Sequence, residues 1–342
     1  MIGVTGATGH LGTVLVRQLV GAGQPVRYLA RRTSRATGLE QMEGPEAGMI
    51  ERVDADLTDE SALARAFRGV RLVYHCAGLV SFMPGNEADL FRVNVEGTRS
   101  VLRAARAAGV RRVIHVGSIE AFPLADGRYP ITEEHGIHPE RTLMTYGRTK
   151  ATSMLDALAA ADTSMEVVVC APTAFLGPTD YRRSPIGQFV LDYLQGRLPA
   201  YIDGGFDFVD VRDVADGVIR AAAYGASGRV YLLSGRYTAI PELIGLLHEV
   251  SGISPPPFYL PARLVAPFTP LVEAYYRLTG VPARFTRESL RLLRLGVTVS
   301  AERARAELGF TSRPIRETLG DSVDWFARRY RMPGITACLE SG

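Results

Sequence analysis

Three glycines, at positions 6, 9 and 12, lie between an apolar run and an amphipathic stretch near the beginning of the chain. The apolar run, residues 2–5, predicts a buried strand, and the apolar spacing that follows predicts a helix from about residue 13 to residue 22. A turn without side chains can be tight and can let a pyrophosphate approach the N–H groups at the helix N-terminus. The spacing therefore predicts an α/β fold that binds a dinucleotide, and a tight turn without a ligand is the alternative.

Short β-like runs alternate with amphipathic helical stretches through the first 120 residues. This alternation is typical of a Rossmann-type, doubly wound parallel sheet with helices on both faces. The expected strands are residues 2–5, 26–30, 50–54, 72–76, 112–116 and 166–170, and the last of them should be broken at Pro172.

The character of the chain changes after Pro172, where prolines and aromatic residues become frequent. Irregular apolar segments that follow a sheet predict a substrate-binding lobe. A return to strand and helix patterns near residues 208–233 makes that lobe discontinuous, and 342 residues suffice for two lobes. We therefore assign residues 1–172 and 206–235 to a nucleotide-binding domain, and residues 173–205 and 236–336 to a smaller C-terminal substrate lobe.

Composition excludes several function classes. The net charge of +3 is spread along the chain and forms no block, so it gives no argument for binding nucleic acid. The three cysteines are far apart and form no CxxC pair, which suits a reducing compartment, and the histidine spacing predicts no metal site. Met1 leads directly into the glycine motif, and no apolar run approaches the roughly 20 residues of a spanning helix. These features predict a cytoplasmic protein.

Tyr146 and Lys150 form the candidate proton-transfer pair. A phenol is a poor acid or base near neutrality because its unperturbed pKa is about 10. A lysine four residues later on a helix lies on the same face, and its charge should lower the pKa of the phenol. A small hydroxyl is needed to orient the substrate oxygen, and Ser118, after the strand expected at residues 112–116, is the candidate.

The end of the second expected strand decides between the two nicotinamide cofactors. An acidic residue there holds a free ribose hydroxyl, whereas arginine accommodates a 2′-phosphate. Residues 30–34 read Ala-Arg-Arg-Thr-Ser and contain no acid. They predict NADP(H), with Arg31 as the first candidate ligand and Arg32 as the second; the alternative is that both are merely solvated.

Taken together, these motifs resemble those of the extended short-chain dehydrogenases/reductases. TGATGHLG is similar to their TGxxGxxG, Tyr146 and Lys150 to their YxxxK, and Ser118 to the serine of their catalytic triad. The resemblance implies that Tyr146 exchanges the proton, that Lys150 lowers its pKa and binds the nicotinamide ribose, and that Ser118 orients the reacting oxygen. The cofactor contacts that it implies are Gly6, Thr8, Gly9, His10, Leu11, Gly12, Asp56, Leu57, Ala77, Gly78, Tyr146, Lys150, Pro172 and Thr173.

Two departures from the family pattern affect the interpretation. Met154 stands where such enzymes often carry a glutamate, so we expect a lost contact on the helix surface that leaves the chemistry unchanged. Sugar 4,6-dehydratases have an acidic pair directly after the serine or threonine, but Ile119 and Glu120 follow Ser118 here. Dehydratase activity is therefore disfavoured. In the family the asparagine at position 94 mostly braces the sheet, so it is left out of the catalytic set.

The remaining choice is between a reductase and a nucleotide-sugar epimerase. The arginines favour a reductase with exchangeable NADP(H), and the chain is most similar to the dihydroflavonol-reductase-like and 3β-hydroxysteroid-dehydrogenase-like groups. Residues 255–276 contain one basic side chain among many apolar ones, which favours an apolar small-molecule substrate. Core packing is the leading alternative for this segment, and contact with a membrane ranks last.

Two further alternatives stay open. Arg182, Arg183 and Arg197 could serve the diphosphate of a sugar nucleotide, which keeps the epimerase as the second candidate. A non-catalytic NADP(H) sensor is the third, although such proteins commonly lose the tyrosine or the lysine. The resemblance also implies a homodimer built on the helix that carries Tyr146 and the helix near residue 100.

Overall fold

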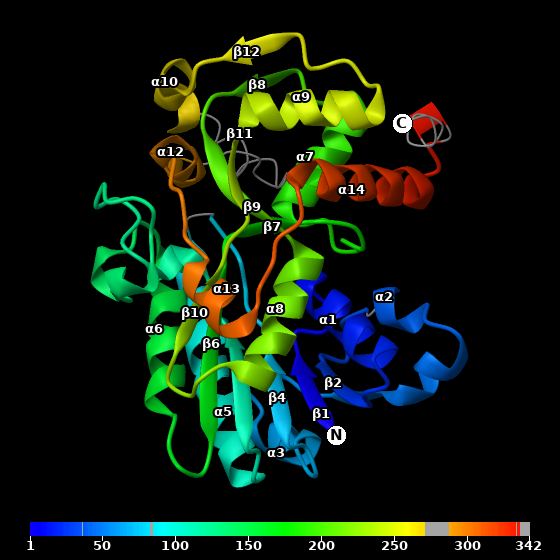
Figure 1. Ribbon diagram of the computed structural model, residues 1–342, viewed down its shortest axis with the longest axis vertical. Coiled ribbons are helices and arrows are strands. Elements are labelled where there is room, and N and C mark those ends of the chain that lie inside the picture. Colours follow the sequence, from blue (N-terminus) through cyan, green and yellow to red (C-terminus); the bar gives the residue numbers. More distant parts are fainter. Residues whose placement is uncertain (36, 83–84, 271–286, 333, 336–342) are drawn as a thin grey trace.

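The computed structural model describes residues 1–35, 37–82, 85–270, 287–332 and 334–335. Two parts lie one above the other, a large α/β domain and a smaller lobe that carries the C-terminal helix (Figure 1). The strands of the large sheet are Ile2–Thr5 (β1), Val26–Ala30 (β2), Ile50–Asp54 (β3), Leu72–His75 (β4), Arg112–Val116 (β5), Glu166–Pro172 (β6) and Val230–Leu233 (β10). All pair in parallel, in the order β10-β6-β5-β4-β1-β2-β3, which confirms the Rossmann-type expectation.

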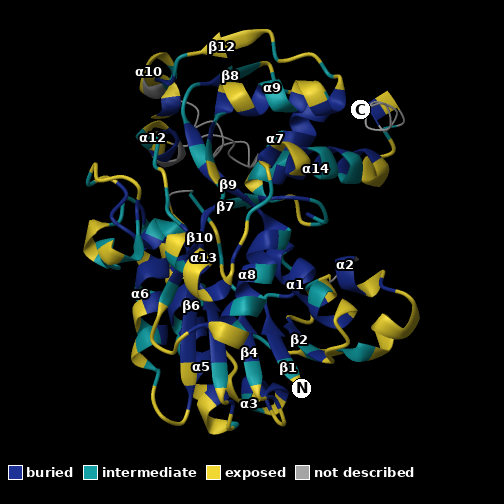
Figure 2. Cartoon of the chain, viewed as in Figure 1, coloured by how far each residue is buried: buried dark blue, intermediate teal, exposed yellow. Residues whose placement is uncertain are grey.

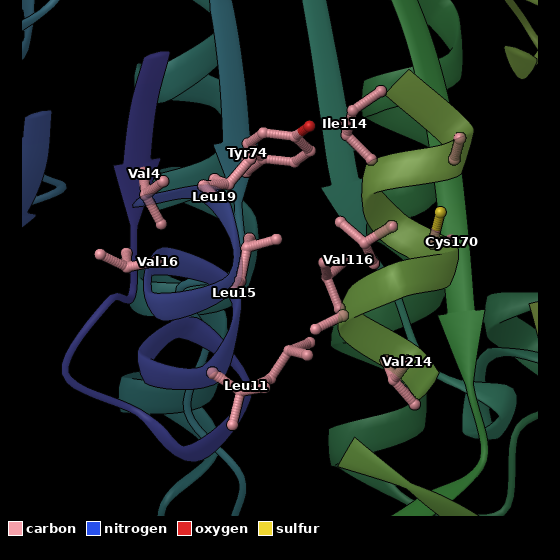
Figure 3. Close-up of a cluster of buried hydrophobic side chains, with 14 of the residues drawn as sticks. Val4, Leu11, Leu15, Val16, Leu19, Tyr74, Ile114, Val116, Cys170 and Val214 are labelled. Atoms are coloured by element: carbon pink, nitrogen blue, oxygen red, sulfur yellow. The ribbon is translucent and has the colours of Figure 1, made fainter. Parts of the chain in front are cut away.

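Helices cover both faces of this sheet because its central strands carry apolar side chains on both sides. The described helices of this part are His10–Gly21 (α1), Thr37–Glu40 (α2), Glu60–Ala66 (α3), Glu87–Phe91 (α4), Gly97–Ala107 (α5), Thr145–Ala159 (α6), Val211–Tyr224 (α8) and Glu302–Leu308 (α13), with a π-helical turn at Arg92–Glu96. Figure 3 shows α1 and α8 closing over one face, where Leu15 and Val214 are fully buried. Helices α3, α5 and α6 cover the other face.

The lobe is built on short strands and on helices that pack against them. Its strands are Ala174–Leu176 (β7), Gly205–Asp210 (β9) and Arg236–Ala239 (β11) in one sheet, and Ala200–Ile202 (β8) and Phe258–Leu260 (β12) in another. Its described helices are Pro185–Leu194 (α7), Ile240–Ser251 (α9), Ala262–Val265 (α10), Arg287–Leu295 (α12) and Ile315–Tyr330 (α14). A third apolar cluster fills this lobe, distinct from the two that flank the large sheet.

Two segments pack in the other part of the molecule from the one to which the sequence assigns them. Strand β9 pairs with β7 and β11 in the small sheet, although residues 206–210 were assigned to the nucleotide-binding domain. Helix α13, assigned to the lobe, packs on α8 and β10 and buries Ala304 and Leu308 in the core of the large domain. In β9 and in α13 alike, an apolar face is covered by a sheet or helix that is distant in the sequence. The local sequence does not reveal which partner covers it.

Strand β6 ends at Pro172, where the break is expected, and β7 begins two residues later in the other sheet. Leu233 is the register partner of Pro172, and the next amide, that of Thr173, donates to Leu233. The position where the proline lacks an N–H faces β5, whose pairing with β6 has already ended at Cys170. No ladder hydrogen bond is therefore lost, so the proline is tolerated there.

Part of the apolar segment 255–276 is on the surface. Phe258, Tyr259, Leu260, Leu264 and Phe268 are all exposed, so core packing is wrong for these side chains (Figure 2). The apolar residues expected at 271–276 lie outside the described residues, as does Cys338. Within the described part of the chain, no helix combines the length and the apolar character needed to cross a bilayer.

Candidate active site

The candidate site lies at the carboxyl ends of the strands where the strand order reverses. From β1 the chain passes to β2 on one side, and later to β4 on the other, so a crevice opens between their carboxyl ends. Gly6 follows β1 with a φ of 72°, and a Cβ there would lie 2.5 Å from the Ala77 nitrogen. Only glycine fits that approach, which brings the glycine turn against the Ala77-Gly78 segment that follows β4.

Helix α1 begins in this crevice. Gly9 is its N-cap, no side chain accepts a hydrogen bond from its first turn, and no acidic residue lies there. Its free N–H groups and the positive end of the helix dipole fit the pyrophosphate of a dinucleotide. The side chains of two expected contact residues point elsewhere: Leu11 is buried in the core, and His10 Nε2 lies 2.9 Å from the carbonyl oxygen of Pro178 in the lobe.

An arginine-rich pocket of about 290 Å³ lies beyond the end of β2. It is lined by Thr8, Arg31, Thr33, Ser34, Arg35, Gly38, Tyr181 and Arg182. Arg31 lies in it as expected, whereas the second candidate, Arg32, is exposed and does not line it. No ion pair involves any of the three pocket arginines among the described residues, and with the Asp56 carboxyl as the nearby acid of Arg31 the pocket carries net positive charge.

Arg52 on β3 fixes the turn that carries Arg31. Its guanidinium donates to the carbonyl oxygens of Arg31 and Ser34, at 3.3 and 3.2 Å. Asp56, after β3, accepts hydrogen bonds from the backbone and side chain of Thr58, which together with Arg31 nearby hold the pKa of its carboxyl below the usual range. The expected Asp56 and Arg31 are thus brought to one end of the crevice.

Ser118 and Tyr146 meet at the carboxyl end of β5. Ser118 accepts a hydrogen bond from the Glu120 amide at 3.2 Å, and its hydroxyl lies close enough to the Tyr146 phenol to act on the pKa of that phenol. Both side chains are buried, since Tyr146 is 8% exposed and Ser118 is 9% exposed. Phe82, from the loop after β4, packs edge-on against the Tyr146 ring with centroids 5.8 Å apart.

Lys150 lies one helical turn further along α6, next to the same crevice. Its ammonium donates to the Val116 carbonyl oxygen at 2.7 Å. Burial lowers the pKa of Lys150 to about 8. Burial also raises the pKa of Tyr146 above its ordinary value, and the charge of Glu120 adds to this, while the Ser118 hydroxyl opposes it. The expected lowering of the Tyr146 pKa by Lys150 is therefore wrong for this geometry, because desolvation dominates and the ammonium is directed at Val116.

The shifted pKa of Lys150 gives a stability prediction. Native Lys150 releases its proton near pH 8, whereas an unfolded lysine does so near pH 10.5. Between these values the unfolded state binds more protons, so stability should rise with pH in that window. We expect Lys150→Met to raise the free energy of unfolding at pH 7 by about 1 kcal/mol. The variant no longer has to desolvate an ammonium, which stabilises it, but it loses the hydrogen bond to Val116, which offsets part of that gain. The variant should also flatten the rise above pH 8.

Urea unfolding of both proteins at pH 7 and pH 10 measures this effect. Arg148→Met is the matched control, because it removes a cation from the exposed face of the same helix. It should change neither the stability at pH 7 nor the pH dependence. Equal or lower stability of Lys150→Met at pH 7 would contradict a desolvated ammonium.

Asn94 braces the loop after β4. Its side-chain oxygen accepts a hydrogen bond from the Leu79 amide at 2.7 Å. Its side-chain nitrogen donates hydrogen bonds to the Leu79 carbonyl oxygen and the Thr149 hydroxyl, each at 3.0 Å. These contacts tie the loop to helix α6 and place Gly78 beside Lys150 Nζ. The bracing role expected for Asn94 thus applies to this loop.

Pro172 and Thr173 lie at the end of β6. The Thr173 hydroxyl donates to Asp207 at 2.9 Å, and the Gly235 amide donates to the same carboxyl at 3.0 Å. Burial raises the pKa of Asp207 to about 6, against the effect of these hydrogen bonds. The Thr173 side chain is therefore held by the lobe, and its amide is already paired with Leu233.

The expected surface position of Met154 is wrong. Its side chain is fully buried, and a Cβ on Gly117 would lie 2.5 Å from its sulfur. Met154 therefore fills the space beneath the end of β5, close to Ser118. A glutamate there would place a carboxylate in the core, so the methionine supports the strand that carries the serine.

Sequence reasoning missed several residues of the site. Phe82 and Glu120 lie next to Tyr146, and Arg35 joins the arginine pocket. Arg182 was considered for a sugar diphosphate, but it lies beside Thr8 and Arg31. Glu120 could have been found from the sequence, because it stands two residues after Ser118. Phe82, Arg35 and Arg182 could not, because they lie on loops whose paths the sequence does not reveal.

The profile of the NAD dependent epimerase/dehydratase family matches residues 2–234, more than half of the chain. Sterol demethylase protein B of Methylococcus capsulatus is 36% identical over 328 residues, which cover 95% of this chain and 98% of that protein. The 4-hydroxy-2-methyl-3-oxo-4-farnesyl-3,4-dihydroquinoline-1-oxide ketoreductase of Stigmatella aurantiaca is 31% identical, with 91% of each chain covered. The crystal structure of gox2253 shares 30% identity at a TM-score of 0.82, covering 97% of this chain and 99% of that one.

These relatives cover at least 91% of this chain and include a ketoreductase. With the crevice at the strand reversal and the buried Ser118–Tyr146 pair, they confirm the resemblance drawn from the motifs. The chain belongs to the NAD-dependent epimerase/dehydratase family, and it is an NAD(P)-dependent oxidoreductase.

Proposed function

We propose that the protein is an NADP(H)-dependent oxidoreductase that interconverts a ketone and a secondary alcohol on an apolar small molecule. Tyr146 gives its proton to the substrate oxygen or takes it back, and Ser118 hydrogen-bonds the same oxygen and holds it next to the phenol. Lys150, buried beside Gly78 in the same crevice, binds the ribose next to the nicotinamide. The nicotinamide, when bound, supplies or accepts the hydride.

The observation that carries this proposal is the identity of residue 150. It is the only lysine in the chain, and the other 38 basic residues counted with it are arginines. The one position where lysine is kept is therefore the position four residues after Tyr146, where its Nζ is buried beside Gly78. A guanidinium is bulkier, planar and always charged, so it cannot replace a compact ammonium there.

The arginine pocket supports NADP(H) over NAD(H). Arg31 and Arg35 bring two guanidiniums to the end of β2, and Thr33 and Ser34 add hydroxyl groups at the same place. A 2′-phosphate would offer these groups three acceptor oxygens, whereas a free ribose hydroxyl would leave the charges without a partner.

Two observations favour an apolar substrate. The Phe82 ring lies against the face of the crevice where Tyr146 exchanges its proton. The relatives named above include a sterol demethylase protein and a ketoreductase of a farnesyl quinoline, which suggests a ring-shaped apolar alcohol or ketone such as a sterol. The epimerase alternative loses one of its arguments, because Arg182 lies at the Arg31 end of the crevice.

A substrate panel tests the proposal. We expect turnover of apolar cyclic ketones or alcohols, sterols among them, with NADPH or NADP⁺ preferred by at least about tenfold in kcat/KM over the phosphate-free cofactor. The assay follows nicotinamide absorbance at 340 nm with both cofactors, and nucleotide sugars serve as the comparison set. Conversion of the sugars alone, followed by chromatography because the cofactor absorbance would show no net change, would establish the epimerase instead.

The homodimer and the cytoplasmic location remain predictions. For the dimer, we propose an interface on α5 and α6. Within one chain these helices are already joined by an ion pair of Arg99 with Asp156 at 2.8 Å, and Arg106 at the end of α5 pairs with Asp162, which follows α6. Their outer faces are thus fixed relative to each other before a partner binds.

A further inference from the structure

Arg182 reaches the arginine pocket from the substrate lobe. It follows β7 in the loop that leads to α7, whereas the other pocket residues apart from Tyr181 belong to the glycine turn and the segment after β2. Its Nη2 donates to the Thr8 hydroxyl at 2.9 Å, so the two parts of the molecule touch within the pocket.

The charges around Arg182 are unfavourable without an anion. Burial and the positive charge of Arg31 both lower the pKa of the Arg182 guanidinium. Arg31, Arg35 and Arg182 converge on one pocket, and none of them has an ion pair within the described part of the chain. Three like charges held together in this way are stabilised when an anion enters between them.

The loop that carries Arg182 is fixed in an unusual conformation. Thr179 and Arg183, on either side of it, have φ values of 68° and 55°, which non-glycine residues seldom adopt. Asp180 is 1% exposed, and its carboxylate accepts a hydrogen bond from the Ser184 amide at 2.7 Å. This bond holds the loop against the start of α7. Such strain persists only where the surrounding structure enforces it, and here the result is to direct Arg182 at Thr8.

Tyr181 connects the pocket to the C-terminal helix of the lobe. A Cβ on Gly38 would lie 2.6 Å from the Tyr181 ring, so this ring packs directly on helix α2. On its other side the ring meets Trp325 of α14, edge-on with centroids 5.2 Å apart, and the Arg329 guanidinium lies 5.8 Å from its centroid. Any shift of the Arg182 loop must therefore change the surroundings of Trp325.

We propose that the pocket binds the 2′-phosphate of the cofactor from two sides, with Arg31 from the nucleotide domain and Arg182 from the substrate lobe. The phosphate then joins the two parts of the molecule, and its binding is transmitted through Tyr181 to α14. This inference rests on the proposed NADP(H) dependence and adds to it that the lobe itself recognises the phosphate.

Trp325 is the only tryptophan in the chain, so tryptophan fluorescence reports on the surroundings of this one side chain, the Tyr181 contact among them. Adenosine 2′,5′-bisphosphate is the probe, and 5′-AMP, which lacks only the 2′-phosphate, is the comparison. We expect the bisphosphate to bind more tightly and to change the Trp325 emission, and 5′-AMP to leave the emission unchanged. Isothermal titration calorimetry gives the affinities independently.

Arg182→Ala should weaken the bisphosphate about ten- to hundredfold, the range for a lost charged hydrogen bond, and should leave 5′-AMP unaffected. It should also abolish the Trp325 response at saturation. Arg31→Ala should weaken the bisphosphate but keep the Trp325 response at saturation, because Arg182 remains. Arg183→Ala is the matched control, since it removes the neighbouring arginine that does not line the pocket.

The outcomes separate this inference from the proposed function. If the wild-type protein binds both nucleotides equally, the NADP(H) preference itself is wrong. If it prefers the bisphosphate and Arg182→Ala keeps both the preference and the Trp325 response, the preference stands and recognition by the lobe is refuted.

Discussion

Tyr146→Phe is expected to reduce kcat by about 10²- to 10⁴-fold, the usual contribution of a positioned acid or base. The substitution removes one hydroxyl and leaves the ring, so the edge-on contact with Phe82 should persist. Ser118 can still hydrogen-bond a substrate oxygen, but no group then exchanges its proton. Cofactor affinity should stay within about twofold, because the phenol contributes no charge to the phosphate sites. Steady-state kinetics on a substrate found by the panel, with a nucleotide titration, measures both quantities.

Tyr129→Phe is the matched control for this variant. It makes the same chemical change in a nearby loop, where the hydroxyl donates to the Leu124 carbonyl oxygen at 2.7 Å. Its kcat should remain close to that of the wild type. Turnover of Tyr146→Phe within a few fold of the wild type would refute the proposed proton transfer, whatever the cofactor preference.

Gly12→Ala should abolish nucleotide binding and destabilise the fold by about 3 kcal/mol or more, at the upper end of the range for overpacking. A Cβ at this position would lie 2.2 Å from the Gly6 carbonyl oxygen and 2.7 Å from the Ala7 Cα. Both atoms are backbone, so relief requires moving the turn itself. Moving it would displace the first N–H groups of α1, which are the groups that should meet the pyrophosphate.

Gly21→Ala provides the comparison within the same helix. A Cβ there would meet only the Glu46 carboxylate, at 3.9 Å, and alanine favours a helix over glycine by up to about 1 kcal/mol. It should therefore be neutral or stabilising. Thermal unfolding and nucleotide titration of the two variants test the argument, and a stable Gly12→Ala protein with normal affinity would show that the turn does not need this close packing.

The sequence predicted most of the large sheet because the signals for it are local. Strands β1, β2, β3 and β5 lie where the apolar runs place them, and the glycine spacing marks the turn that feeds α1. Likewise, the i, i+4 spacing of Tyr146 and Lys150 places both on one helix. In each case the decisive residues are neighbours in the chain, so the chemistry of the backbone and a short repeat suffice.

Electrostatics at the site could not be derived from spacing. The sequence predicted that Lys150 lowers the pKa of Tyr146, but the pKa is raised because both groups are buried and the Lys150 ammonium donates to Val116. Desolvation depends on how closely the crevice is packed, and that is a property of the assembled fold.

By itself, the sequence determined the parallel α/β fold, the dinucleotide turn and the residue types available for proton transfer. Only the tertiary structure decided that Arg182 joins Arg31, that Phe82 lies on Tyr146, and that helix α13 closes the core of the large domain. The physical reason is the separation of these partners along the chain, which is about 150 residues between Arg31 and Arg182. Local pattern determines a strand or a helix, whereas contacts over such separations depend on which surfaces the folded elements leave to be covered.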